Sequence, residues 1–74
     1  MSTALNVTPE ARREWPYAVG VTMPGDESPT FVHFAHKPTA NVHAYVMDTD
    51  RNIVTRWVAL EDGSGWREVT YFYL

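Results

Sequence analysis

The chain has 74 residues, no cysteine, nine acidic and six basic side chains, and a formal net charge of −3. This length predicts one small domain over residues 1–74, and the lack of cysteine excludes a disulfide framework and a thiolate metal site. The acidic balance argues against a nucleic-acid binder, which would carry a basic patch, and permits a basic protein partner. Because neither a signal peptide nor an apolar run long enough for a membrane span is present, we expect a cytoplasmic protein.

The N-terminal part of the chain predicts a short edge strand, Thr3 to Val7, followed by a short helix. The helix is expected from Thr8 to Trp15, because a threonine that can act as N-cap precedes a proline that suits the first helical turn. Pro16 then ends the helix.

The rest of the chain predicts strands, because runs rich in β-branched and aromatic residues alternate with short polar separators. We therefore expect an α+β fold, an antiparallel β-sheet meander of about five strands with one short N-terminal helix packed on it. The expected strands are Tyr17 to Met23, Thr30 to His36, Val42 to Met47, Ile53 to Leu60 and Arg67 to Tyr73.

Both faces of this predicted sheet are apolar, and one short helix cannot cover both of them. Either the segment from Tyr17 to Met23 covers the second face, or part of that face awaits a partner.

The histidines and serines do not form a recognisable catalytic or metal site. His33 and His36 would point to opposite faces of one strand, and a zinc site at His33 and His43 would need a carboxylate as its third ligand. The motif Gly63-Ser64-Gly65 is typical of a turn, and no G-x-S-x-G nucleophile elbow occurs. We therefore expect no enzyme activity, no metal and no cofactor.

Most of the carboxylates fall in predicted loops, where they commonly make local hydrogen bonds. The alternative is that these loops present carboxylates to a basic groove of another protein and so imitate phosphates. The loop carboxylates are Asp26, Glu27, Asp48, Asp50, Glu61 and Asp62.

Several short motifs occur in an order that is similar to a known family. They are Glu27-Ser28, Val32-His33-x-Ala35, Asn41-Val42 with Asp48 six residues later, Trp57 with Ala59-Leu60, an acidic turn containing glycine, and a last strand ending in Leu74. Together with the Pro9-Glu10 helix start, these motifs resemble the small phage uracil-DNA glycosylase inhibitors over roughly residues 5–74, with gaps.

The resemblance implies a protein inhibitor that acts in the cytoplasm of the host cell and binds uracil-DNA glycosylase one to one. Members of this family mimic DNA, with an antiparallel sheet of five strands and helices. An edge strand carrying Glu-Ser enters the DNA groove of the enzyme, and a cavity between sheet and helix takes in a leucine from an enzyme loop. Direct binding to nucleic acid or to a membrane is not implied.

Two groups of residues follow from this resemblance. The expected acidic or polar contact residues are Asp26, Glu27, Ser28, Asp48, Asp50 and Glu61. The expected cavity residues are Val7, Ala11, Trp15, Val32, His43, Tyr45 and Leu60.

One departure from the family concerns the inserting strand. The family carries its critical Glu-Ser before the helix, whereas Glu27-Ser28, the only Glu-Ser in this chain, follows the predicted helix. The inserting element is then expected either at Asp26-Glu27-Ser28 or on an edge formed by Tyr17 to Met23.

Other functions also fit the sequence. An inhibitor of a different host enzyme would use the same acidic loops. A structural β domain would associate with itself through exposed sheet edges. A small enzyme or ligand binder would use His33 and His43.

Overall fold

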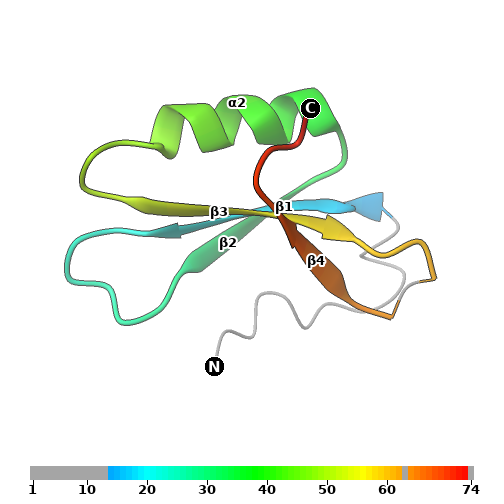
Figure 1. The fold of residues 1–74 in the computed structure, drawn as a ribbon, viewed down its shortest axis with the longest axis horizontal. Helices are drawn as coiled ribbons and strands as arrows, with labels where there is room; N and C mark the ends of the chain where they lie inside the picture. The colour runs from blue at the N-terminus through cyan, green and yellow to red at the C-terminus, as the bar shows by residue number, and fades with distance from the viewer. Residues whose placement is uncertain (1–13, 63, 74) are drawn as a thin grey trace.

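The computed structural model of the chain describes residues 14–62 and 64–73, which form an antiparallel sheet with one helix on one of its faces (Figure 1). This confirms the predicted α+β class and the antiparallel sheet. The described part of the chain contains four strands rather than about five. The elements are β1 (Tyr17–Thr22), β2 (Thr30–Phe34), α2 (Lys37–Met47), β3 (Ile53–Ala59) and β4 (Trp66–Val69).

The predicted N-terminal elements fall largely on residues that the structure does not describe. The expected strand from Thr3 to Val7 lies wholly outside the described residues, and the expected helix from Thr8 to Trp15 lies outside them except at its last two residues.

The strand order is β2-β1-β3-β4, which differs from a simple meander. Strand β1 pairs antiparallel with β2 on one side and with β3 on the other, so β2 and β3 run parallel with β1 between them. Two parallel strands cannot be joined by a tight turn and need a crossover connection. Helix α2 is that crossover, and it packs over the three strands β1, β2 and β3.

The predicted strand from Val42 to Met47 is wrong, because these residues form the second half of α2. Pro38 lies in the first turn, where its missing N–H costs no hydrogen bond, and Ala40 and Ala44 lie four residues apart on the buried face. Packing of this alanine face on the sheet overrides the strand preference of the β-branched valines.

No helix in the described part of the chain combines the length and the apolar character needed to cross a membrane.

The core lies between α2 and the sheet. Val19 and Val21 of β1 are buried beneath Ala40 and Ala44. After β4 the chain turns toward the helix side of the sheet (Figure 1) and buries Phe72, whose ring meets Tyr17 edge-on at a centroid distance of 5.9 Å. The predicted last strand, Arg67 to Tyr73, therefore ends early because Phe72 leaves the sheet to complete the core.

Strand β1 is an inner strand of the sheet itself, so it does not cover the second face as one of our two alternatives required. On the face without the helix, larger side chains of β2 and β3 pack over the small residues of β1 instead. A Cβ on Gly20 would lie 2.6 Å from Thr55 Oγ1 and 2.7 Å from Phe31 Cε1. Trp57 donates from Nε1 to Thr55 Oγ1 at 3.0 Å, and its ring meets that of Phe31 edge-on.

This close approach predicts that Gly20→Ala lowers the free energy of unfolding by about 1–3 kcal/mol, because the added methyl group must displace Thr55 or Phe31. Urea unfolding followed by tryptophan fluorescence measures the change. Gly65→Ala is the matched control, since a Cβ there meets nothing within 4 Å, and it should leave stability unchanged or raise it by up to about 1 kcal/mol. Equal midpoints for the two variants would contradict the packing described at Gly20.

Candidate functional site

A small apolar hollow lies between β2 and the second half of α2, with a volume of about 210 Å³. Val21 of β1 pairs with Thr30 of β2, and Val19 pairs with Val32, so these side chains share the face that carries the helix. The helix contributes His43 and Met47 from adjacent turns. We call this feature the β2–α2 hollow, and it is lined by Val21, Met23, Asp26, Thr30, Val32, His43 and Met47.

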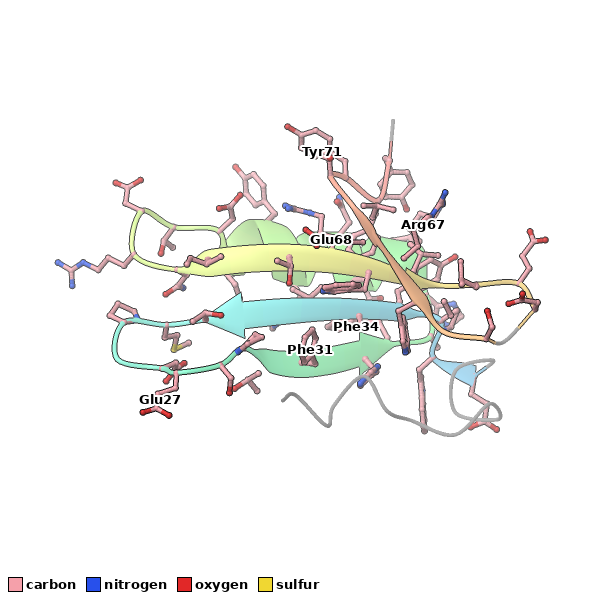
Figure 2. All side chains as sticks on the ribbon, turned by 60° about the horizontal axis from the view of Figure 1, so that its bottom comes forward. Glu27, Phe31, Phe34, Arg67, Glu68 and Tyr71 are labelled. Atoms are coloured by element: carbon pink, nitrogen blue, oxygen red, sulfur yellow. The ribbon has the colours of Figure 1, made fainter. Side chains whose placement is uncertain are left out.

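The loop from β1 to β2 borders this hollow and has a defined shape. Asp26 accepts a hydrogen bond from the Met23 backbone N–H at its Oδ2, at 3.0 Å, and donates its own N–H to the Met23 carbonyl, also at 3.0 Å. Gly25 makes this turn possible with a φ of 92°, a left-handed conformation that residues with a Cβ rarely adopt. The Asp26 carboxylate therefore fixes the loop, while Glu27 points away from the sheet at its tip (Figure 2).

A second acidic connection lies at the same end of the sheet. The turn that joins α2 to β3 leads into Ile53, which pairs with Thr22 at the start of the β1–β2 loop. Both connections are on the left in Figure 1. This places Asp48 and Asp50 at the same end as Asp26 and Glu27. Asp48 is 3.9 Å from the guanidinium of Arg56, a largely buried cation that offsets part of its charge.

Of the expected cavity residues, Val32 and His43 meet in the β2–α2 hollow. His43 reaches it from a helix rather than from the expected strand, and its ring lies 5.3 Å from that of Phe34. Val21, Met23 and Met47, which also line the hollow, were not expected. For Met23 and Met47, the signal in the sequence is their position at the ends of two apolar segments, Tyr17 to Met23 and Val42 to Met47.

The other expected cavity residues lie elsewhere or are not described. Tyr45 is on the outer surface of α2 with 79% of its surface exposed, so its assignment to the cavity is corrected. Leu60 and Trp15 lie at the far end of the sheet, because Leu60 follows the end of β3, where Ala59 donates its N–H to the Pro16 carbonyl at 2.8 Å. Val7 and Ala11 are outside the described residues.

The expected contact residue Glu61 also belongs to the far end, in the turn between β3 and β4. It lines a separate open hollow of about 540 Å³ together with Leu60, Asp62 and Arg67. Asp26 lines the β2–α2 hollow together with Val32 and His43, and Glu27 and Ser28 follow Asp26 in the same loop. Glu61 and Leu60 lie at the other end of the sheet.

The two histidines that were candidates for a shared site lie on opposite sides of the sheet. His33 pairs with Ala18, and its ring lies 5.4 Å from that of Trp66 on the face without the helix. His43 lies on the helix side. In residues 14–62 and 64–73, no three His, Asp, Glu or Cys side chains come together in a way that would hold a metal ion.

In the far-end turn, hydrogen bonds shift one carboxyl pKa. The Ser64 hydroxyl donates to Asp62 Oδ1 at 2.7 Å and the Ser64 N–H donates to the same oxygen at 2.9 Å, which together lower the pKa of Asp62. Hydrogen bonds to the ionised carboxylate favour its charged form. The two hydrogen bonds therefore stabilise the folded protein at pH values above the ordinary pKa of Asp62. This stabilisation is lost as the pH falls through the lowered pKa.

We predict that Ser64→Ala raises the pKa of Asp62 toward its ordinary value, because the stronger hydroxyl donor is lost while the backbone donor stays. A pH titration of the carboxyl carbon by NMR measures this. Ser28→Ala is the control and should leave the Asp62 titration unchanged. A pKa of Asp62 that stays equally low in Ser64→Ala would contradict the role of the hydroxyl.

Comparison with known proteins finds no match, neither to a family model, nor to a curated protein, nor to a solved structure. The resemblance to uracil-DNA glycosylase inhibitors therefore rests on the sequence motifs quoted above. The partner that it implies stays a prediction.

Proposed function

We propose that the protein is a stoichiometric inhibitor of uracil-DNA glycosylase, which it binds one to one by occupying the DNA groove of the enzyme. The observation that carries this proposal is the β2–α2 hollow, an apolar recess that opens beside the two acidic connections at one end of the sheet. The resemblance in sequence supplies the identity of the enzyme. The hollow supplies a site for the enzyme loop that such inhibitors take in.

The dimensions of the hollow favour a protein side chain over a small molecule. Sites for drug-sized ligands occupy about 300–1,000 Å³, whereas this hollow measures about 210 Å³. Its walls are mostly hydrocarbon and thioether groups from Val21, Val32, Met23 and Met47. Methionine side chains adapt their shape to an incoming group. A branched aliphatic side chain such as leucine is therefore the occupant that the hollow would accept.

The charges around the hollow fit a basic groove on the partner. Glu27 is exposed at the loop tip, and Asp48 and Asp50 are exposed at the neighbouring connection. Carboxylates arranged in this way attract a basic surface over distance and favour one docking orientation. Arg51 is the one basic residue of that connection, so the end of the sheet stays net acidic within the described residues.

The position of β2 fits the relocated inserting element. Within the described sheet, β2 is an edge strand that pairs only with β1, and Asp26, Glu27 and Ser28 lead into it. β1 is an inner strand that pairs on both sides, so the alternative in which Tyr17 to Met23 forms the edge is excluded. The Glu-Ser pair, the edge strand and the apolar hollow are therefore contiguous, as the inhibitory surface requires.

The experiment is a titration of a bacterial uracil-DNA glycosylase with the protein, with uracil release from DNA as the readout. We expect inhibition that reaches completion near one inhibitor per enzyme. If a many-fold molar excess leaves uracil release unchanged with several bacterial enzymes, the proposal is rejected.

Two variants separate the roles of the hollow and of the loop. Val32→Ala should speed dissociation of the complex about tenfold, because it removes apolar contact at the centre of the surface. Glu27→Ala should mainly slow association by several-fold, and more so at low salt, because it removes an exposed steering charge. Surface plasmon resonance separates the two rates.

Glu68→Ala is the matched control for charge, because Glu68 lies on β4 opposite Trp57, away from the β1–β2 loop (Figure 2). It should bind like the parent protein. If Glu27→Ala binds and inhibits like Glu68→Ala, the relocated inserting element is wrong even when the parent inhibits.

A further inference from the structure

A third hollow lies on the helix side of the sheet, at the end away from the β1–β2 loop. Its volume is about 470 Å³, which falls within the range of about 300–1,000 Å³ that sites for small molecules occupy. We call it the β4 hollow, and its lining includes Lys37, Val58, Arg67, Val69, Tyr71 and Phe72.

The fold brings two cations to the β4 hollow from different elements. Tyr17, Val58 and Arg67 lie side by side on β1, β3 and β4, and residues that pair directly in this way share one face of the sheet. Val58 packs against the core beneath α2, so Arg67 also lies on the helix side. Lys37 reaches the same hollow from the first turn of α2.

Neither cation is neutralised by a carboxylate. Among the described residues, the one ion pair within 4 Å joins Arg56 to Asp48. Lys37 Nζ lies 5.2 Å from the centre of the Tyr73 ring, and this contact holds the ammonium group beside the hollow without cancelling its charge. The first turn of α2 carries no acidic residue, so the positive end of the helix dipole adds to the charge of Lys37.

The nearest carboxylates are directed elsewhere or exposed to water. Glu68 borders the hollow, but it directly follows Arg67 in the strand and therefore points to the face without the helix. Glu61 and Asp62 line the adjacent far-end hollow. Glu61 is exposed, and the Asp62 carboxylate is held by the two hydrogen bonds from Ser64. The β4 hollow therefore stays positive in a chain whose net charge is −3.

An exposed aromatic ring forms another wall of the hollow. Tyr71 lines it and exposes 64% of its surface, and the guanidinium carbon of Arg56 lies 5.8 Å from the centre of the Tyr71 ring. This contact restrains the ring although most of it is open to water. A planar base can stack on such a ring whatever hydrogen-bonding groups its edges carry.

We propose that the β4 hollow binds a mononucleotide, with the phosphate group between Lys37 and Arg67 and the base stacked on Tyr71. A phosphate monoester carries a charge of about −1.5 to −2 at pH 7, which matches the two cations. The arginine fork donates parallel hydrogen bonds to two phosphate oxygens, and the lysine adds a compact point charge. This inference is independent of the proposed inhibitory function, because the β4 hollow and the β2–α2 hollow lie at opposite ends of the sheet.

The experiment is a titration of the ¹⁵N-labelled full chain with adenosine monophosphate, followed by amide NMR shifts. We expect saturation with a dissociation constant in roughly the millimolar range, because the hollow is open and the ligand is small. The shifts should centre on Lys37 and on residues 67–71. Adenosine lacks the phosphate and inorganic phosphate lacks the ring, so each should bind at least about fivefold more weakly.

Substitutions assign the contacts to individual residues. Lys37→Gln, Arg67→Gln and Tyr71→Ala should each weaken binding of adenosine monophosphate at least about fivefold. Arg51→Gln is the matched control for charge, because Arg51 is exposed at the opposite end of the sheet. Tyr45→Ala is the control for the ring, because Tyr45 is exposed on α2 outside the hollow. Both controls should bind like the parent chain, and the amide spectra verify that every variant keeps the fold.

Salt separates the two halves of the site. At about 1 M salt, where the Debye length falls to about 3 Å, adenosine monophosphate should bind several-fold more weakly and adenosine should be unaffected. Unchanged spectra at about 20 mM adenosine monophosphate, well above the expected dissociation constant, overturn the proposal. It is also overturned if adenosine or inorganic phosphate binds as tightly as the nucleotide, or if Arg67→Gln and Arg51→Gln lose the same affinity.

Discussion

The close approach of α2 to β1 through Ala40 and Ala44 determines the rest of this structure. Both alanines are fully buried, and Val19 beneath them is fully buried as well. Larger side chains at these two positions would hold the helix away from the sheet. Because the alanines lie on one face, they also fix the rotation of the helix about its own axis. His43 and Met47 are thereby directed to the side of β2, and Val42, Tyr45 and Val46 are directed outward.

The crossover through α2 has a second consequence for the site. A helix that leaves β2 and returns to β3 must run back along the sheet, so it ends where the β1–β2 loop begins. The acidic connection after α2 and the acidic loop after β1 are therefore neighbours in space although they are separated in the sequence. The topology thus brings both acidic connections to the end of the sheet at which the β2–α2 hollow lies.

The sequence predicts β1, β2 and β3 closely, but it does not predict the crossover. Alternation and β-branched residues place β1, β2 and β3 within one or two residues of their observed ends. The same signal in Val42 to Met47 leads to error, because valines are also accepted in a helix that packs on a sheet. Pro38 in a first turn and alanines four residues apart were the opposing signals. These signals favour the helix only because the alanines contact β1, and the periodicity of the sequence does not reveal such contacts.

The error in secondary structure explains which of the expected cavity residues come together in the structure. In a strand, His43 and Tyr45 point to the same face, which is compatible with the single cavity that the resemblance implies for both. In a helix of 3.6 residues per turn, two positions apart correspond to a rotation of about 200°, which sends the two side chains to nearly opposite sides. His43 therefore lines the hollow, and Tyr45 lies on the exposed outer surface of α2. Val32 and Asp26 line the same hollow, because β2 and the loop before it lie where the sequence predicts them.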